Sequence, residues 1–366
     1  MGMMRKATLS LLLIAVMALV AVACGGGGSD SSSTSEEASG GGGGSVTIDL
    51  GEGQSVEAEK GKQLTVGLFL AGTVTRYMQA FDSGVHAAAD EFGYDVETFD
   101  PAFDPTKQFN QMQTSLTTSP DIDAAIAVPL NPDQACKLLS ETAPANEVVV
   151  VVSVNAICGR GGNAPEEMWQ PGTLAFNDAD NTIPYREGWL RAIGERLTKP
   201  TKIALFLGPP LIQDTIAIEG ALKAVEPEFP DMEIVTKLRT DYTTPDALAQ
   251  TQTMLRANPD IEGIISPYSD TTSGILTALE EEGKAGKVKV FDIGASKFAL
   301  QAIKEGKVEL TVPFTPYTAG YEAMTALHEA FEGEQPERLL PGLKYGSIEE
   351  PLIITKSNLD AAEPQF

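Results

Sequence analysis

Few side chains in this chain have the reactivity that metal binding or acid–base catalysis requires. It contains two histidines, His86 and His328, which stand alone in segments of helical period, and it has no Cys-x-x-Cys pair. Because a metal site needs several such ligands close together, the sequence predicts no metal and no other cofactor. The G-x-S-x-G, G-x-x-x-x-G-K-S/T and H-E-x-x-H patterns are also absent, so we do not expect an enzyme.

Cys24 is the first residue whose surroundings indicate a covalent modification. It follows residues 9–23, an apolar run without acidic residues that comes after a short basic start. This run has the length of an export signal and is short for a membrane span. Residues 21–24, AVAC, resemble a bacterial lipobox, in which the peptide before the cysteine is removed and its sulfur is acylated. The sequence predicts a signal peptide over 1–23 and an extracytoplasmic protein anchored to the membrane through lipidated Cys24. The alternative is an ordinary signal peptide with an incidental cysteine.

The residues after Cys24 predict a linker. Residues 25–45 are almost entirely glycine, serine and acidic residues, which bury too little surface to offset the entropy of ordering. Residues 46–63 are compatible with a short strand pair or with more linker. We therefore assign residues 24–63 to the lipidated cysteine and its linker.

The charge of the chain limits its partners. The formal net charge is -25, and it becomes -27 without residues 1–23, which carry two basic residues and no acidic one. Such a surface repels nucleic acid and anionic lipid. We expect no nucleic acid partner and no direct lipid contact by the folded body.

From Leu64 onward, apolar segments of strand length alternate with segments of helical period. Many of the strand segments are apolar throughout, as in strands covered by helices on both faces. Strand–helix–strand alternation predicts an α/β fold with parallel sheets and right-handed crossovers. It occurs twice, which predicts two doubly wound lobes with a ligand cleft at the carboxyl ends of their strands. The predicted strands are 64–70, 94–100, 124–130, 147–154, 202–208, 233–239, 261–267, 287–294 and 308–314.

In this order and spacing, several segments resemble those of the periplasmic binding proteins of type 1, the ribose-binding-like receptors of sugar importers. They are YMQAFDSGVHAAADEFGYDV, PDIDAAIAVPLNPDQ, FNDADN, IEGIISPYSDTTSGILTALEEEG, KVKVFDIGAS and LIITKSNLD. The resemblance covers nearly everything from Leu64 to Leu359. It implies a hinge of three crossings, an N-terminal lobe of 64–175 plus 314–345, and a C-terminal lobe of 176–313 plus 346–359.

The resemblance also implies which loops of the first lobe face the ligand. After the first strand the family places a polar residue and aromatic residues, and this loop offers Thr75, Arg76 and Tyr77. After the fourth strand the family has an Asp-Arg pair that holds the sugar. Here Asn155 and Ala156 stand in its place.

The second lobe and the hinge depart from the family pattern as well. An aromatic residue is kept as Tyr242, whereas the family's asparagine is Tyr268, with Asp270 close by. The family's aspartate corresponds to Asp292, or to Gly294 in another alignment. Its hinge glutamine is replaced by Phe314, and the arginine expected after GPPLIQD is Ala217.

These departures bear on the ligand, because charge-assisted bonds from carboxylate and guanidinium groups hold a sugar's hydroxyls. Aromatic faces instead favour flat or apolar surfaces. The ligand expected is a modified sugar, a sugar acid, a nucleoside or another ring-bearing metabolite, with Arg76 as a candidate partner of a ligand carboxylate or phosphate.

Cys136 and Cys158 are an even pair in a chain predicted to be exported, where a disulfide is permitted. Each follows one of two neighbouring predicted strands, so both are expected at the same edge of the first lobe. We predict a disulfide between them.

The function that the resemblance implies is solute binding for an ABC importer. The protein is expected to be a monomer that closes around its ligand and docks on the membrane permease. A surface sensor that passes the closed form to a membrane receptor remains open as an alternative. Effector-binding halves of repressors share the fold, but they carry a helix-turn-helix and a basic surface, which this chain lacks.

Overall fold

The computed structural model describes residues 44–366, apart from 119–120, 178–180, 341, 343–344 and 348–349. The predicted signal peptide, Cys24 and nearly all of the glycine- and serine-rich spacer lie outside the described residues. No helix of the described part is both long and apolar enough to cross a bilayer.

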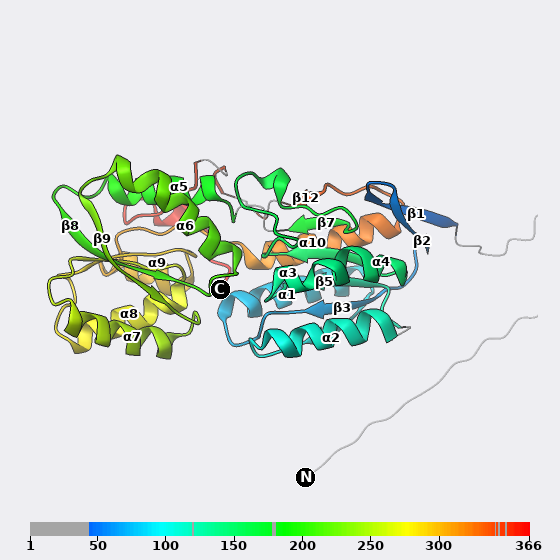
Figure 1. Cartoon of the computed structure of the whole chain (residues 1–366), viewed down its shortest axis with the longest axis horizontal. Helices are drawn as coiled ribbons and strands as arrows, with labels where there is room; N and C mark the ends of the chain where they lie inside the picture. Colours follow the sequence, from blue (N-terminus) through cyan, green and yellow to red (C-terminus); the bar gives the residue numbers. More distant parts are fainter. Residues whose placement is uncertain (1–43, 119–120, 178–180, 341, 343–344, 348–349) are drawn as a thin grey trace, which may run out of the picture. The chain divides into compact units, whose positions relative to one another are not determined.

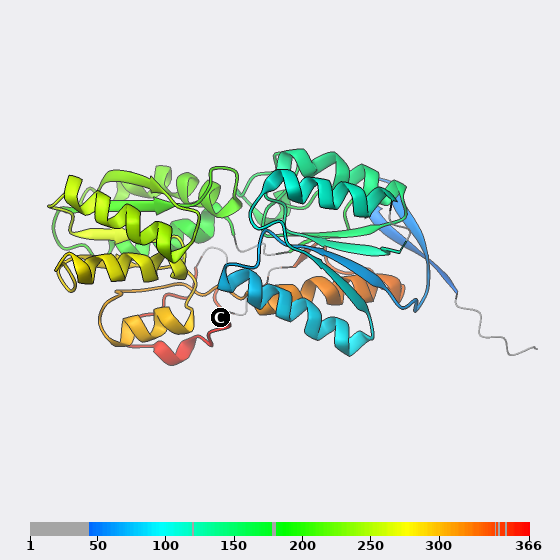
Figure 2. The same ribbon diagram turned by 90° about the horizontal axis from the view of Figure 1, so that it is seen from below.

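The first lobe is built on a six-stranded sheet with the spatial order β12-β7-β6-β5-β3-β4, in which all neighbours are parallel. Successive residues of β6 alternate between two cores: Val149 and Val151 pack with α1 and α10, and Val150 and Val152 pack with α2 and α3. Helices cover both sides of this sheet (Figure 2). The strands are β3 (Thr65–Phe69), β4 (Asp95–Phe99), β5 (Ala124–Ala127), β6 (Val149–Ser153), β7 (Ala175–Asn177) and β12 (Leu339–Leu340).

The helices of this lobe cover both faces of its sheet (Figure 1). They are α1 (Arg76–Phe92), α2 (Pro105–Thr118), α3 (Pro132–Lys137) with a π-turn at Leu138–Thr142, α4 (Ala143–Ala145) and α10 (Pro316–Phe331), with a 3-10 turn at Pro165–Glu167. The proline at the first turn of α3, which the sequence marks as a helix start, leaves no amide group unsatisfied there.

The second lobe has a four-stranded parallel sheet with the order β11-β10-β8-β9. In β8, Ile203 and Leu205 face α5 and α6, whereas Ala204 and Phe206 face α7 and α8. Its elements are β8 (Thr201–Leu207), β9 (Met232–Arg239), β10 (Gly263–Ile265), β11 (Lys289–Phe291), α5 (Ile183–Gly194), α6 (Gln213–Val225), α7 (Thr244–Ala257), α8 (Ser269–Glu281) and α9 (Lys297–Lys304), with 3-10 turns at Glu226–Glu228 and Leu359–Ala361.

The chain crosses between the lobes three times. The first crossing follows β7, and the second leads from the second lobe into α10. The third leads from β12 back to the second lobe, where Ile354 pairs with Thr311. The predicted strand at 308–314 forms only isolated bridges, such as Phe291 with Leu310. Pro313 lies in this segment and has no N–H to donate to a ladder. The short strands β7 and β12 were not predicted.

Residues 46–63, which the sequence left compatible with a strand pair or with more linker, contain most of an antiparallel hairpin of β1 (Ser45–Gly51) and β2 (Gln54–Glu59). It buries Ile48, Leu50 and Val56. Arg338 beside β12 bonds to Asp49 of the hairpin at 2.6 Å. The hairpin therefore corrects the boundary predicted at Leu64, because the folded body includes residues from Ser45 onward.

Two glycines allow α1 and α10 to lie against each other along their length (Figure 2). A Cβ at Gly84 would lie 2.0 Å from the carbonyl oxygen of Tyr317, and one at Gly320 would lie 2.1 Å from that of Phe81. This packing fixes the first turn of α1, which is capped by the Thr75 hydroxyl accepting from the amide of Met78.

Cys136 of α3 and Cys158 are joined by a disulfide, with their Cα atoms 4.8 Å apart. It links the segments that follow β5 and β6 at one edge of the first lobe.

Candidate functional site

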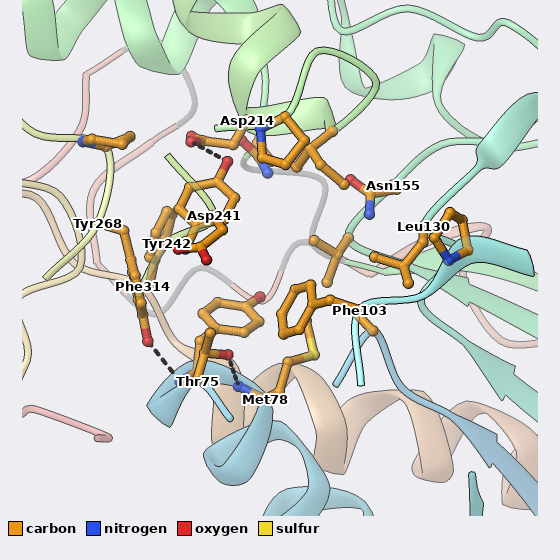
Figure 3. A pocket seen from close by; sticks show the side chains of 18 residues that line it. Thr75, Met78, Phe103, Leu130, Asn155, Asp214, Asp241, Tyr242, Tyr268 and Phe314 are labelled. Atoms are coloured by element: carbon orange, nitrogen blue, oxygen red, sulfur yellow. Dashed lines mark hydrogen bonds between the residues drawn. The ribbon is translucent and has the colours of Figure 1, made fainter. Parts of the chain in front are cut away.

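A cavity of about 310 Å³ lies where the carboxyl ends of the strands of both sheets meet (Figure 3). Its lining residues come from segments that follow β3, β4, β5 and β6 of the first lobe and β8, β9 and β10 of the second. This is the edge at which parallel α/β sheets bind ligands, and the volume suits a small molecule.

The structure places most of the predicted binding residues on the wall of this cavity and three of them elsewhere. Those that line it are Thr75, Tyr77, Asn155, Tyr242, Tyr268 and Phe314. Those that do not are Arg76, Asp270 and Asp292.

Interlocking aromatic rings form one side of the cavity. Tyr77 meets Phe314 edge to face with ring centres 5.6 Å apart, and Tyr242 meets Tyr268 in the same manner at 6.0 Å. Phe103, which was not predicted, adds another ring (Figure 3). Such a wall presents ring faces and edges to an apolar face of a ligand.

Tyr268 also joins the two lobes directly. Its hydroxyl accepts a hydrogen bond of 2.8 Å from the main-chain amide of Tyr77, at the first turn of α1 (Figure 3). Burial and, to a smaller extent, the nearby Asp270 carboxylate raise the pKa of Tyr268 well above 10. The hydroxyl therefore stays protonated at neutral pH.

Asn155 makes a second connection between the lobes. Its side-chain oxygen accepts from the amide of Gln213 at the start of α6, at 2.9 Å, and its side-chain nitrogen donates to the carbonyl of Pro129 at 3.0 Å. The preceding residue, Val154, has a φ of 67°, which is unusual for a β-branched residue. Both polar atoms of this asparagine are thus used within the protein.

Tyr242 is held in place by its own backbone and by Gly208. Its φ is 66°, in the left-handed region that is rare for residues other than glycine. A Cβ at Gly208 would lie 1.9 Å from its hydroxyl oxygen, so glycine leaves the space for the ring. Burial, followed by the charge of Asp214, raises the pKa of Tyr242 well above 10.

A buried arginine that sequence reasoning missed lies behind this wall. Arg186 of α5 is fully buried and pairs with Asp214 of α6, with 2.8 Å between Nη2 and Oδ1. The same Nη2 donates to Asn181 at 2.8 Å, and the guanidinium carbon lies 5.2 Å from the ring centre of Phe314. The arginine expected at Ala217 is thus absent, and a neighbouring helix brings another one behind the pocket. Arg186 stands next to an aromatic residue in PYREGW, which is a weak signal.

Arg76 and Asp270 contact each other, and neither lines the cavity. Arg76 Nε lies 3.4 Å from Asp270 Oδ1, so the two form an ion pair between α1 and α8. The Arg76 side chain is half exposed, at 50%. Its guanidinium group faces the carboxylate of Asp270.

Asp292 also lies outside the cavity lining and is surrounded by hydroxyl groups of the protein. It is fully buried and accepts hydrogen bonds from the hydroxyls of Thr311 at 2.7 Å, Ser269 at 3.2 Å and Thr272. Burial raises its pKa from 3.8 to about 7. It supports the hinge segment behind the pocket.

The charged residues that line the cavity are Asp214 and Asp241, both acidic. Asp214 is paired with Arg186, and Asp241 is exposed at the rim, where it caps the turn at Thr243. None of the described residues that line the cavity is basic. Within the described part of the chain there is also no cluster of three or more side chains suited to a metal ion. The arrangement favours a neutral ligand with an apolar face.

Comparisons with known proteins agree with this architecture. A family model described as a periplasmic binding protein domain matches residues 66–335. The ribose import binding protein of Bacillus subtilis (strain 168) is 23% identical over 280 residues, covering 76% of this chain and 85% of that protein.

Solved structures show the same fold. An ABC transporter solute-binding protein from Mycobacterium smegmatis with bound glycerol superposes with a TM-score of 0.71 at 22% identity, covering 83% of this chain and 99% of that one. One from Bacillus halodurans C-125 with bound myo-inositol gives 0.70 at 18% identity, covering 83% and 98%.

Proposed function

Because the chain belongs to the family of periplasmic binding protein domains, we propose that it is the solute-binding lipoprotein of an ABC importer for a neutral sugar or polyol. The observation that carries the proposal is the cavity between the two sheets, with aromatic rings on one side and no basic side chain among the described residues of its lining. The ligand is bound and released unchanged.

The size and chemistry of the cavity support this ligand class. A volume of about 310 Å³ fits a molecule of the size of a pentose, hexose or cyclitol. Related proteins are named for ribose import or hold glycerol or myo-inositol. A sugar acid or a phosphate would bring its negative charge beside Asp214 and Asp241, and the part of the lining that the structure describes offers no basic residue to pair with it.

The proposed mechanism is closure of the lobes around the ligand. A ligand that contacts both lobes stabilises the closed arrangement more than the open one. The closed form then docks on the permease, and acylated Cys24 keeps the protein at the outer face of the membrane. Partition of the wild type, but not of a Cys24→Ser variant, into the detergent phase would support the anchor. Equal partition of both would contradict it.

The ligand class is tested by thermal shift of the purified protein with D-ribose, myo-inositol, glycerol, D-gluconate and adenosine. A ligand that binds the native state alone raises the melting temperature. We expect a shift with D-ribose or myo-inositol and none with D-gluconate. Tyr242→Ala should abolish the shift, whereas Tyr317→Ala, an exposed tyrosine of α10, should retain it. A shift with gluconate alone, or turnover of a compound, would refute the proposal.

A further inference from the structure

The last two residues of the chain lie between the lobes and bond to both of them (Figures 1 and 2). Gln365 makes two hydrogen bonds with Thr318 of α10: the side-chain nitrogen of Gln365 donates to the Thr318 hydroxyl at 2.7 Å, and the Thr318 amide donates to the Gln365 side-chain oxygen at 3.1 Å. The carbonyl oxygen of Phe366 accepts from the amide of Lys297, at the start of α9, at 2.9 Å. One end of this segment is therefore fixed to the first lobe and the other to the second.

The ring of Phe366 packs behind the aromatic wall of the cavity. It stacks on Tyr268 with ring centres 5.9 Å apart and an interplanar angle of 18°. It also meets Tyr77 at 6.4 Å and 68°. Tyr77 and Tyr268 line the cavity, whereas Phe366 does not, so Phe366 acts on the cavity through these two tyrosines.

The backbone next to Phe366 leaves room for its ring. Gly294 has a φ of 128°, and a Cβ there would lie 3.1 Å from the tip of the Phe366 ring and 2.8 Å from the Ser269 hydroxyl. The chain therefore has a glycine where a side chain would crowd both the ring and the start of α8.

We infer that Phe366 is a positioning residue for the binding site: its ring holds Tyr268 so that the Tyr268 hydroxyl accepts from the Tyr77 amide and the two tyrosines form one wall. In this inference, Phe366 packs against two tyrosines of the cavity wall from outside the cavity. It rests on the proposed function only for the role of the cavity, because the Tyr77–Tyr268 hydrogen bond joins two parts of the chain itself.

The test is hydrogen exchange of the Tyr77 amide, followed by mass spectrometry of the full chain without ligand. Phe366→Ala should raise the exchange rate at Tyr77 roughly two- to tenfold, the range that corresponds to the loss of one aromatic pair. Phe366→Tyr keeps the ring and should restore slow exchange. Peptides from α7, far from the segment, should not change.

Phe298→Ala is the matched control. Phe298 is half-buried like Phe366, but it packs against the second-lobe core that includes α7 and α8. It should lower stability without accelerating exchange at Tyr77 specifically. An unchanged rate in Phe366→Ala, an unprotected Tyr77 amide in the wild type, or an equal acceleration in Phe298→Ala would overturn the inference.

A binding measurement separates this inference from the proposed function. If D-ribose or myo-inositol binds the wild type, Phe366→Ala should weaken that binding and Phe366→Tyr should restore it. If no neutral sugar or polyol binds, D-ribose, myo-inositol and glycerol included, the proposed function fails, and the exchange data alone decide the role of Phe366.

Discussion

The fully buried Arg186 forms an ion pair with Asp214 at the wall of the cavity, with 2.8 Å between Nη2 and Oδ1. The pair bridges α5 and α6, and Asp214 itself lines the cavity. Removing one partner of such a pair leaves an uncompensated charge in a dry environment, which costs more than the pair itself contributes.

We therefore expect Asp214→Ala to lower the free energy of unfolding by about 3–5 kcal/mol, measured by urea denaturation. Arg191→Ala is the control, since Arg191 lies on α5, the helix that carries Arg186, and pairs with Glu228 at the surface. Loss of the Arg191–Glu228 pair should lower the free energy of unfolding by about 1 kcal/mol or less. Equal losses in the two variants would show that the buried charge is compensated by water.

Gly208 and Tyr242 give a prediction about packing. A methyl group at position 208 would overlap the Tyr242 hydroxyl, which lies 1.9 Å from the position of such a Cβ. Gly208→Ala should therefore destabilise the protein by about 1–3 kcal/mol and displace a ring of the binding site. In a Tyr242→Ala background the same change should cost much less, because the two residues share one contact.

A double-mutant cycle of unfolding free energies measures this coupling. Gly161→Ala serves as the control, since the nearest atom to a Cβ there is 3.9 Å away. Additive effects of the changes at 208 and 242 would contradict the packing described for Tyr242.

The ion pair of Arg76 with Asp270 predicts a salt effect on closure. It joins the lobes, but the Arg76 side chain is half exposed, so the pair should contribute about 1 kcal/mol or less. Arg76→Gln should weaken sugar binding by roughly two- to fivefold at low salt and by less at high salt, as measured by calorimetry. Arg256→Gln, which breaks the Arg256–Glu282 pair within the second lobe, should leave affinity unchanged at both salt concentrations. A loss with Arg76→Gln that is independent of salt would point to a direct ligand contact instead.

Much of the fold could be predicted from the sequence because its strands are buried on both faces. Residues 149–152 are all valine, and each side of this run packs on a different layer of helices. The two-residue strand β12 is too short to produce a pattern, and it forms only because β7 is there to pair with it. The hairpin at Ser45–Glu59 was left open because its strands are short and follow a glycine-rich linker, although residues 46–50 alternate between apolar and polar side chains.

The lining of the candidate site was predictable to the extent that it follows strand ends. Tyr77, Tyr242 and Tyr268 each come shortly after a strand, where a parallel sheet binds ligands. Arg186 and Phe366 were missed, because their positions depend on helices and loops that meet only in the folded protein. Asp292 was assigned to the ligand from the family pattern, whereas hydroxyls from α8 and the hinge surround it in the structure.

Asp292 predicts a pH dependence of stability with an unusual sign. Its pKa in the folded protein is about 7, raised from 3.8 mainly by burial. Between these two values the folded state binds a proton at this group and the unfolded state does not. The contribution of this group to the free energy of unfolding is therefore largest at low pH, and it is lost as pH rises from about 4 to about 7.

We expect Asp292→Asn to remove this dependence, because the amide stays neutral at every pH. The unfolding free energy of the wild type minus that of Asp292→Asn should fall as pH rises through this window, by up to about 4 kcal/mol at about 1.4 kcal/mol for each pKa unit. Urea denaturation of both proteins at a series of pH values measures it. Asp260→Asn is the control: Asp260 is exposed and hydrogen-bonded to Lys202, which lowers its pKa, so its contribution has the opposite sign. A difference that is flat with pH would mean that the hydroxyls around Asp292 keep the carboxylate charged despite its burial.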